Sequence, residues 1–221
     1  MTPVRSKVNY QIKMEQIISA LPSDRVPVLF LHACCAPCSS YVLETLSRYF
    51  KIRLFFYNPN IFPEEEYRYR LSEVKRLIAE LPLQNPVEVI DGDYFPEQFT
   101  ELARGLENEP ERGERCKRCI ALRLRETVIQ AANEGADFVT TTLSISPHKD
   151  AAFINEKGVE LCNEYGAVWL YSDFKKKGGY LRSIELSKEY SLYRQDFCGC
   201  VYSKAARMRE IEAQSSQNNP H

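Results

Sequence analysis

Short apolar runs alternate with amphipathic stretches along most of this chain. The run Val28–Leu31 is continuously apolar, as in a strand that is buried on both faces of a sheet. The stretch 37–50 that follows repeats its apolar residues on one face of a helix. The same alternation predicts further strands at 52–57, 87–90, 138–141 and 168–171, and helices at 64–78, 96–106, 117–133 and 150–165. Strands separated by helices predict an α/β fold, with a doubly wound, mostly parallel, five-stranded sheet of Rossmann-like type and flanking helices.

The 221 residues fit one domain with short additions at its ends. We expect residues 1–25 to form an N-terminal extension with a surface helix at about 9–20. Residues 26–214 are expected to form a single α/β domain that ends in a helix from about 200 to 213, and the cysteines described below make it a metal-binding catalytic domain. The polar stretch 215–221 is expected to be a disordered tail.

Charge is balanced along the chain, with 29 basic and 30 acidic residues. The protein is therefore no polycation, and any surface that binds nucleic acid must be local. The sequence shows no apolar run of about 18 residues and no signal peptide, which predicts a cytoplasmic protein that does not contact a membrane. Because cytoplasmic thiols stay reduced, metal binding or redox catalysis explains clustered cysteines there better than disulfides do.

Seven of the eight cysteines fall into three tight groups. The groups are Cys34, Cys35 and Cys38; Cys116 and Cys119; and Cys198 and Cys200. Each group supplies thiolates from one short piece of backbone, which is what a site for a soft metal requires. Cys162 stands alone in a predicted helix and is expected to be a small buried core residue.

The two later groups together supply four sulfurs, which is enough for a closed metal site. A site of four thiolates holds structural zinc or an iron–sulfur cluster. The wide separation and unequal spacing of the two pairs differ from a zinc knuckle, so an iron–sulfur cluster is favoured. Both pairs are expected to open helices, whose free N–H groups stabilise thiolates.

The first group admits two interpretations. Cys35 and Cys38 follow a strand and open a helix, as in thioredoxin-like dithiol oxidoreductases. Such an enzyme does not need the adjacent thiol of Cys34, so we favour a second, open metal site built from all three cysteines. His32 is a further candidate ligand, although a histidine at a strand end is more often a hydrogen-bonded structural residue. The loop contains no glycine, which argues against a phosphate cradle here.

Cations and tyrosines alternate after the last predicted strand. The candidate RNA-binding residues among them are Lys175, Lys176, Tyr180 and Arg194. Such a mixture suits an unpaired RNA loop, because phosphates bind cations and bases stack on aromatic rings. The alternative is a solvated loop with core tyrosines.

With these residues in view, the chain resembles the QueH family of epoxyqueuosine reductases over about residues 30–203. The matching motifs are His32–Cys38, Asn58–Ile61, Tyr67, Arg68 and Arg70, Arg115–Cys119, Thr140–Leu143 with Ser146, Pro147 and Lys149, Asp173–Lys176, Gly179 and Tyr180, and Leu192–Gln195 with Cys198–Cys200. The resemblance implies a sheet of the adenine-nucleotide α-hydrolase type whose nucleotide loop has become a metal loop. The last position of the first motif can be acidic in relatives, so Cys38 departs from the family pattern at the second metal.

The resemblance also implies a reaction and its cofactors. Epoxyqueuosine at the wobble position of a tRNA anticodon would lose its epoxide oxygen and become queuosine, the last step of that pathway, with electrons from an external one-electron donor. A [4Fe-4S] cluster would be held by Cys116, Cys119, Cys198 and Cys200, and a second, mononuclear iron by Cys34, Cys35 and Cys38. Asp93 and Asp173 each follow a predicted strand and are candidate proton donors, or each caps a turn.

Three rival functions remain. A thioredoxin-like dithiol oxidoreductase would use Cys35 and Cys38 and would need no iron. A zinc-stabilised RNA-binding module would hold zinc and catalyse nothing. ATP-dependent tRNA thiolation on a similar fold is disfavoured, because the chain lacks a Gly-rich pyrophosphate loop after the first strand.

Overall fold

The computed structural model describes residues 8–217 of the chain. Its strands are β1 (Val28–His32), β2 (Lys51–Phe56), β3 (Val87–Asp91) and β4 (Phe138–Thr141). Its helices are α1 (Tyr10–Ser19), α2 (Ala36–Leu46), α3 (Glu64–Glu80), α4 (Pro96–Ala103), α5 (Glu114–Asn133), the 3-10 helix η1 (Thr142–Ile145), α6 (Ala151–Tyr165), α7 (Gly179–Glu189) and α8 (Val201–Gln217).

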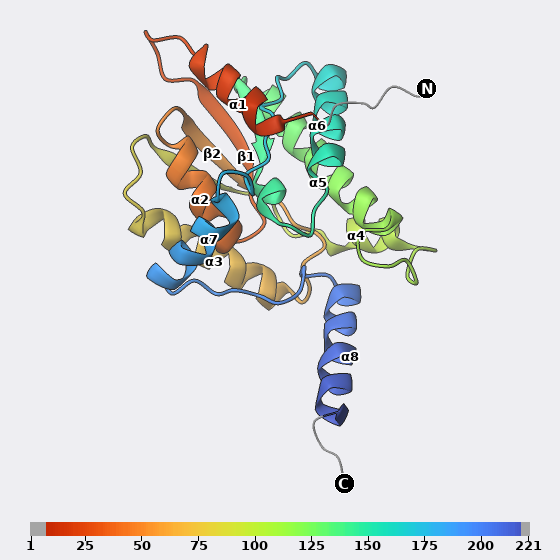
Figure 1. The fold of residues 1–221 in the computed structure, drawn as a ribbon. Helices are drawn as coiled ribbons and strands as arrows, with labels where there is room; N and C mark the ends of the chain where they lie inside the picture. Colours follow the sequence, from red (N-terminus) through yellow and green to blue (C-terminus); the bar gives the residue numbers. More distant parts are fainter. Residues whose placement is uncertain (1–7, 218–221) are drawn as a thin grey trace, which may run out of the picture.

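The four strands form one parallel sheet in the order β3-β2-β1-β4, with helices on both faces (Figure 1). Alternate residues of β1 enter different cores. Leu29 and Leu31 pack with apolar residues of α2 and α3, whereas Phe30 packs with those of α5 and α6. The structure therefore confirms an α/β fold with a parallel sheet and flanking helices, and it explains why β1 is apolar at successive positions.

Residues 168–171 do not form the predicted fifth strand. They lie beside β4 through a single parallel bridge between Val139 and Trp169. β4 ends at Thr141 and the chain turns into η1, while the backbone of Ser172 binds the side chain of Asn155 instead of a neighbouring strand. The sheet of the described residues therefore has four strands, and 168–171 is an extra segment along its β4 edge.

The N-terminal extension packs on the domain. α1 lies within the predicted helix at about 9–20, and its Met14 is buried in the core shared by α2 and α3. The ring of Tyr10 stacks on that of Tyr171, with 6.0 Å between the centroids. Arg25 forms an ion pair with Asp137, just before β4. α1 is thus a surface helix with one buried side.

α7 is a helix that the sequence pattern did not predict. It begins after Gly178, whose φ of 78° is a left-handed conformation that glycine adopts readily. A side chain at Gly179 would lie 2.0 Å from the carbonyl oxygen of Phe174, so the two glycines mark a tight helix start. The same two glycines, beside three lysines, are typical of a loop in a one-dimensional pattern.

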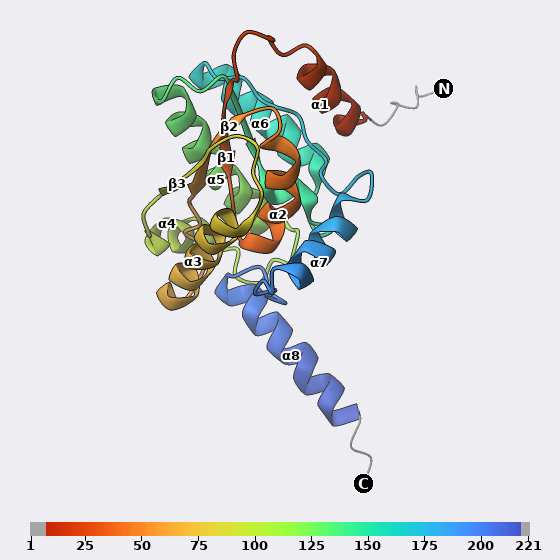
Figure 2. The same cartoon turned by 90° about the vertical axis from the view of Figure 1, so that its left-hand side faces the viewer.

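α8 projects away from the rest of the molecule (Figures 1 and 2). Its first turn follows Cys200 and lies next to the cavities described below. The helix continues to Gln217, which overlaps the predicted tail 215–221, and 218–221 lie outside the described residues. Within residues 8–217, no helix is both long enough and apolar enough to cross a bilayer.

Candidate metal centre

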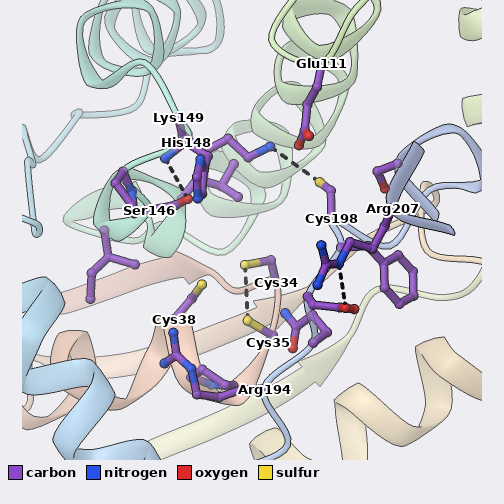
Figure 3. Close-up of a pocket in the computed structure, with 18 of the residues that line it drawn as sticks. Cys34, Cys35, Cys38, Glu111, Ser146, His148, Lys149, Arg194, Cys198 and Arg207 are labelled. Atoms are coloured by element: carbon purple, nitrogen blue, oxygen red, sulfur yellow. Dashed lines mark hydrogen bonds and ion pairs between the residues drawn. The ribbon is translucent and has the colours of Figure 1, made fainter. Parts of the chain in front are cut away.

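Cys34, Cys35 and Cys38 lie together where β1 ends and α2 begins. Their Sγ atoms all lie within 4.8 Å of one another, and Cys35 is the N-cap residue of α2 (Figure 3). The adjacent thiols of Cys34 and Cys38 lower the pKa of Cys35 well below its ordinary value. Three sulfurs at this separation can bind one soft metal ion and leave a coordination position open.

The four later cysteines line one cavity of about 320 Å³. Cys116 and Cys119 lie on the first two turns of α5, and Cys198 and Cys200 lie on the loop that leads into α8. Within the described part of the chain, no three of these four sulfurs lie within 4.8 Å of one another. The wider spacing suits a multi-iron cluster, in which each thiolate binds a different iron, better than a single ion.

The two groups of sulfurs occupy adjoining cavities. Cys34, Cys35 and Cys38 line a cavity of about 280 Å³, and Cys198 lines both this cavity and the one of about 320 Å³. The lining residues common to both cavities are Glu111, Arg123, Lys149, Cys198, Ser203 and Ala206. The fold thus brings three cysteine groups that are far apart in sequence to one place at the carboxyl ends of the strands.

Several of the sulfurs accept hydrogen bonds. The ammonium of Lys149 donates to Sγ of Cys198 at 3.4 Å (Figure 3). The backbone N–H of Ser203 donates to Sγ of Cys200 at 3.4 Å. Burial raises the pKa of Cys119 to about 11, so binding a metal at this thiol releases a proton. Donors aimed at sulfur stabilise thiolates, which are the form that binds metals.

Arg123 is a buried cation with no anionic partner. It is 2% exposed, its Nε donates to the carbonyl of Cys119, and its Nη1 donates to Oδ1 of Asn58. Among residues 8–217, neither Arg123 nor Lys149 forms an ion pair with a carboxylate. Since burying a cation without an ion-pair partner is costly, the two cations favour a negatively charged group bound between them. A metal group bound by thiolates carries such a charge, so the donor set fits iron bound by cysteine.

Four buried polar atoms on residues that line the two cavities have no hydrogen-bond partner within the described structure. They are Nη2 of Arg70, Oε1 of Gln195, Oδ1 of Asn60 and Nε of Arg115. Buried polar groups are rarely left unpaired in folded proteins, and each unsatisfied group costs about 1–3 kcal/mol. The walls of both cavities therefore offer donors and acceptors to which a bound polar group can hydrogen-bond.

His32 is a structural residue rather than a metal ligand. It is fully buried, Nε2 lies 3.1 Å from the carbonyl oxygen of Tyr57, and Nδ1 lies 2.9 Å from Oγ1 of Thr141. These contacts assign the hydrogen to Nε2 and make Nδ1 the acceptor, so neither nitrogen is free for a metal. Burial and the nearby Arg123 lower the pKa of His32 to about 4, which keeps it neutral.

The two predicted proton donors lie away from the cysteines. Asp93 is exposed in the turn after β3, and Asp173 forms an ion pair with Lys175 at 2.5 Å. Asp173 lines a hollow beside the start of α1 that shares Lys149 with the two cysteine cavities, and Asp93 lines neither cysteine cavity. A catalytic role for either carboxylate stays a prediction, and the geometry does not bring them together.

The predicted RNA-binding residues divide between two places. Tyr180 and Arg194 line the cavity of Cys34, Cys35 and Cys38. Lys175 and Lys176 instead line the hollow next to the start of α1, together with Asp173. Only the first pair is therefore placed to contact a substrate at the cysteines.

Sequence reasoning missed Arg123 and did not single out Glu111. Arg123 lies seven residues after Cys116 and four after Cys119, which puts all three on one face of α5. This helical spacing is a signal that could have identified Arg123. Glu111 gives no such signal, because it belongs to an irregular turn before α5.

Comparison with known proteins identifies relatives over nearly the whole chain. The sequence model of the family described as "Epoxyqueuosine reductase QueH" matches residues 29–206. The "Epoxyqueuosine reductase QueH" of Streptococcus pyogenes serotype M1 is 41% identical over 209 residues, covering 93% of this chain and 81% of the relative. The protein of the same name from Acinetobacter baylyi is 40% identical and covers 81% and 82%, and that from Thermotoga maritima is 34% identical and covers 87% and 98%.

Proposed function

Because the chain belongs to the QueH family of epoxyqueuosine reductases, which are oxidoreductases, we propose that it reduces epoxyqueuosine to queuosine at the wobble position of a tRNA anticodon. The reaction consumes two electrons and two protons and releases the epoxide oxygen as water. One observation carries the proposal: three cysteine groups, remote in sequence, line two adjoining cavities that share Cys198.

In this proposal the cysteines divide between two cofactors. Cys116, Cys119, Cys198 and Cys200 hold a [4Fe-4S] cluster, and Cys34, Cys35 and Cys38 hold a second iron. When bound, the cluster supplies electrons one at a time, and the iron acts as a Lewis acid. The thiolate donors, their hydrogen bonds and the unpaired cations on the shared wall support this division.

The cavity of Cys34, Cys35 and Cys38 is the proposed binding site for the modified nucleoside. Its volume of about 280 Å³ is close to the lower end of ordinary ligand pockets, which suits one nucleoside. Tyr180 and Phe197 line it and can stack on a base that has left the anticodon stack. Arg194 lines the same cavity and can bind a neighbouring phosphate.

His148 is the proton donor that this geometry favours. It lines the nucleoside cavity, whereas Asp93 and Asp173 do not. Nη2 of Arg112 lies 2.7 Å from Nδ1 of His148 and donates to it, so Nε2 carries the hydrogen. The Nε2–H of His148 can donate a hydrogen bond to the developing alkoxide, and such a donor must lie within hydrogen-bond reach of the reacting atom.

The tRNA and an external one-electron donor are the proposed partners. Lys175 and Lys176 lie outside the nucleoside cavity, so in this proposal they bind RNA backbone remote from the modified base. A tRNA substrate and eight free cysteines support a cytoplasmic location, where thiols stay reduced. The parallel order β3-β2-β1-β4 supports a sheet of the adenine-nucleotide α-hydrolase type.

Anaerobic reconstitution with iron and sulfide, followed by metal analysis and turnover, tests the proposed function. The substrate is tRNA that carries epoxyqueuosine, and the product is measured as queuosine after digestion to nucleosides. We expect a brown protein with about four or more irons per chain that forms queuosine when a reductant is added. Bound zinc without iron would instead indicate the RNA-binding module, and dithiol-dependent activity without metal would indicate a thioredoxin-like enzyme.

A further inference from the structure

The wall between the two cysteine cavities carries two cations. Arg123 and Lys149 are the basic side chains that line both cavities. Lys149 donates to Sγ of Cys198, the cysteine common to both cavities (Figure 3). Nε of Arg123 donates to the carbonyl of Cys119. Both cations therefore lie beside the proposed cluster ligands.

The rest of the protein does not neutralise these two charges. Within residues 8–217 the other contacts of Arg123 are neutral, and the sulfur of Cys198 is the hydrogen-bond acceptor of the Lys149 ammonium. Arg70, a third buried cation nearby, differs because it forms an ion pair with Glu66 at 2.7 Å. A buried guanidinium persists only when an opposite charge or strong acceptors surround it. Glu111 is the carboxylate that lines both cavities, and within the described residues it forms no ion pair with Arg123 or Lys149, so the nearest anions are the thiolates.

We propose that Arg123 and Lys149 are built-in counter-charges that raise the reduction potential of the proposed iron–sulfur cluster. The inference rests on the proposed function, because it assumes a cluster held by Cys116, Cys119, Cys198 and Cys200. Reduction adds negative charge to a cluster, and a fixed cation stabilises the reduced form more than the oxidised form. The N–H···S bond to Cys198 acts in the same direction, because hydrogen bonds to cluster sulfur also raise the potential.

The same cations could instead bind substrate phosphate, and burial argues against this. Arg123 is 2% exposed, so its guanidinium cannot reach an RNA backbone at the surface. Arg194, which is exposed and lines the nucleoside cavity, is better placed for a phosphate. Arg123 is therefore a positioning residue that acts on the metal group, and Lys149 is assigned to the same role by its hydrogen bond to Cys198.

Anaerobic redox titration of the reconstituted protein, followed by visible absorbance and electron paramagnetic resonance, tests this inference without substrate. Lys149→Met removes the charge and keeps the length of the side chain, whereas Lys149→Arg keeps the charge. At the wild-type midpoint potential, we expect the ratio of reduced to oxidised cluster in Lys149→Met to fall about tenfold, which is a shift of about 59 mV for a one-electron couple. Lys157→Met, which removes a surface cation paired with Glu160, is the matched control and should leave the potential unchanged.

The outcomes separate the inference from the proposed function. A wild-type protein that assembles no cluster would overturn both. A wild-type cluster with an unchanged potential in Lys149→Met would overturn the inference alone. If Lys149→Met fails to hold a cluster while Lys149→Arg holds one, the charge requirement is supported; if both fail, Lys149 has a structural role and the inference is wrong. Arg123→Lys and Arg123→Met provide the same comparison at the buried position.

Discussion

Replacing Asn155 tests how the segment beside β4 is held. Asn155 is fully buried in α6, and its Nδ2 donates to the carbonyl of Ser172 at 2.8 Å. Its Oδ1 accepts from Nε1 of Trp169 at 3.0 Å and from the backbone N–H of Ser172 at 2.9 Å. One amide therefore holds the end of the segment where its single bridge to β4 stops.

The size of the effect follows from the groups that a substitution leaves unpaired. Asn155→Leu keeps a similar volume but removes the partner of three buried groups: the indole N–H of Trp169 and the N–H and C=O of Ser172. Each unpaired group costs about 1–3 kcal/mol. Partial relaxation of the segment toward water offsets some of this cost, so we expect a loss of about 3–4 kcal/mol in the free energy of unfolding.

Urea unfolding measures this loss directly, because the only tryptophan of the chain, Trp169, lies in the network and reports on its environment. With a slope of about 2–3 kcal/mol per molar urea, the unfolding midpoint should fall by roughly 1–2 M. Asn163→Leu, an exposed change on the same helix, is the control and should shift the free energy of unfolding by less than about 0.5 kcal/mol. Both variants are compared with the wild type at matched metal content, under anaerobic conditions.

A wild-type midpoint in Asn155→Leu would refute this reasoning. It would mean that backbone packing alone holds the segment and that the amide network contributes little. The wall of the metal centre depends on the same network, because Oγ of Ser172 lies 2.9 Å from Oγ of Ser144 in η1, which precedes Lys149.

Three further predictions concern the metal, the RNA and the N-terminal extension. Cys34→Ala should abolish turnover yet keep most of the cluster absorbance. The control Cys162→Ala, which removes a buried thiol of the apolar core, should keep both turnover and absorbance. Full turnover in Cys34→Ala would contradict a second metal site. Binding of tRNA should weaken steeply with salt, and Arg194→Ala should reduce the slope of log affinity against log salt by about 0.7; an unchanged slope would mean that Arg194 contacts no phosphate. Asp137→Asn should lower the free energy of unfolding by about 1 kcal/mol at pH 7, because the carboxylate binds Arg25 and a backbone N–H. Arg25 holds the pKa of Asp137 below its ordinary value of 3.8, so this contribution is present above that pH and disappears as the pH falls through the folded-state pKa. Urea unfolding of wild type and Asp137→Asn at neutral and at strongly acid pH measures the contribution. An equal difference in the free energy of unfolding at both pH values would contradict the assignment.

The local elements of this protein could be predicted because their patterns are one-dimensional. β1 and β2 are buried on both faces, so successive residues are apolar, and this pattern is visible without a structure. The sequence pattern did not predict α7 and was wrong about a strand at 168–171, because both depend on contacts that the local pattern does not contain. The first depends on two glycines at a tight packing site, and the second depends on a side chain, Asn155, that is remote in sequence.

The sequence by itself determined which residues can bind a metal, because seven cysteines in three tight groups, in a chain with few other soft donors, favour metal binding. Only the tertiary structure decided which of them meet, that Cys198 lines both cavities, and that Arg123 is buried beside them. The same folding placed Asp173 in a different hollow from the cysteines. The reason is physical: spacing along the chain sets which side chains share a helix face or a turn, whereas strand order and helix packing set which loops converge.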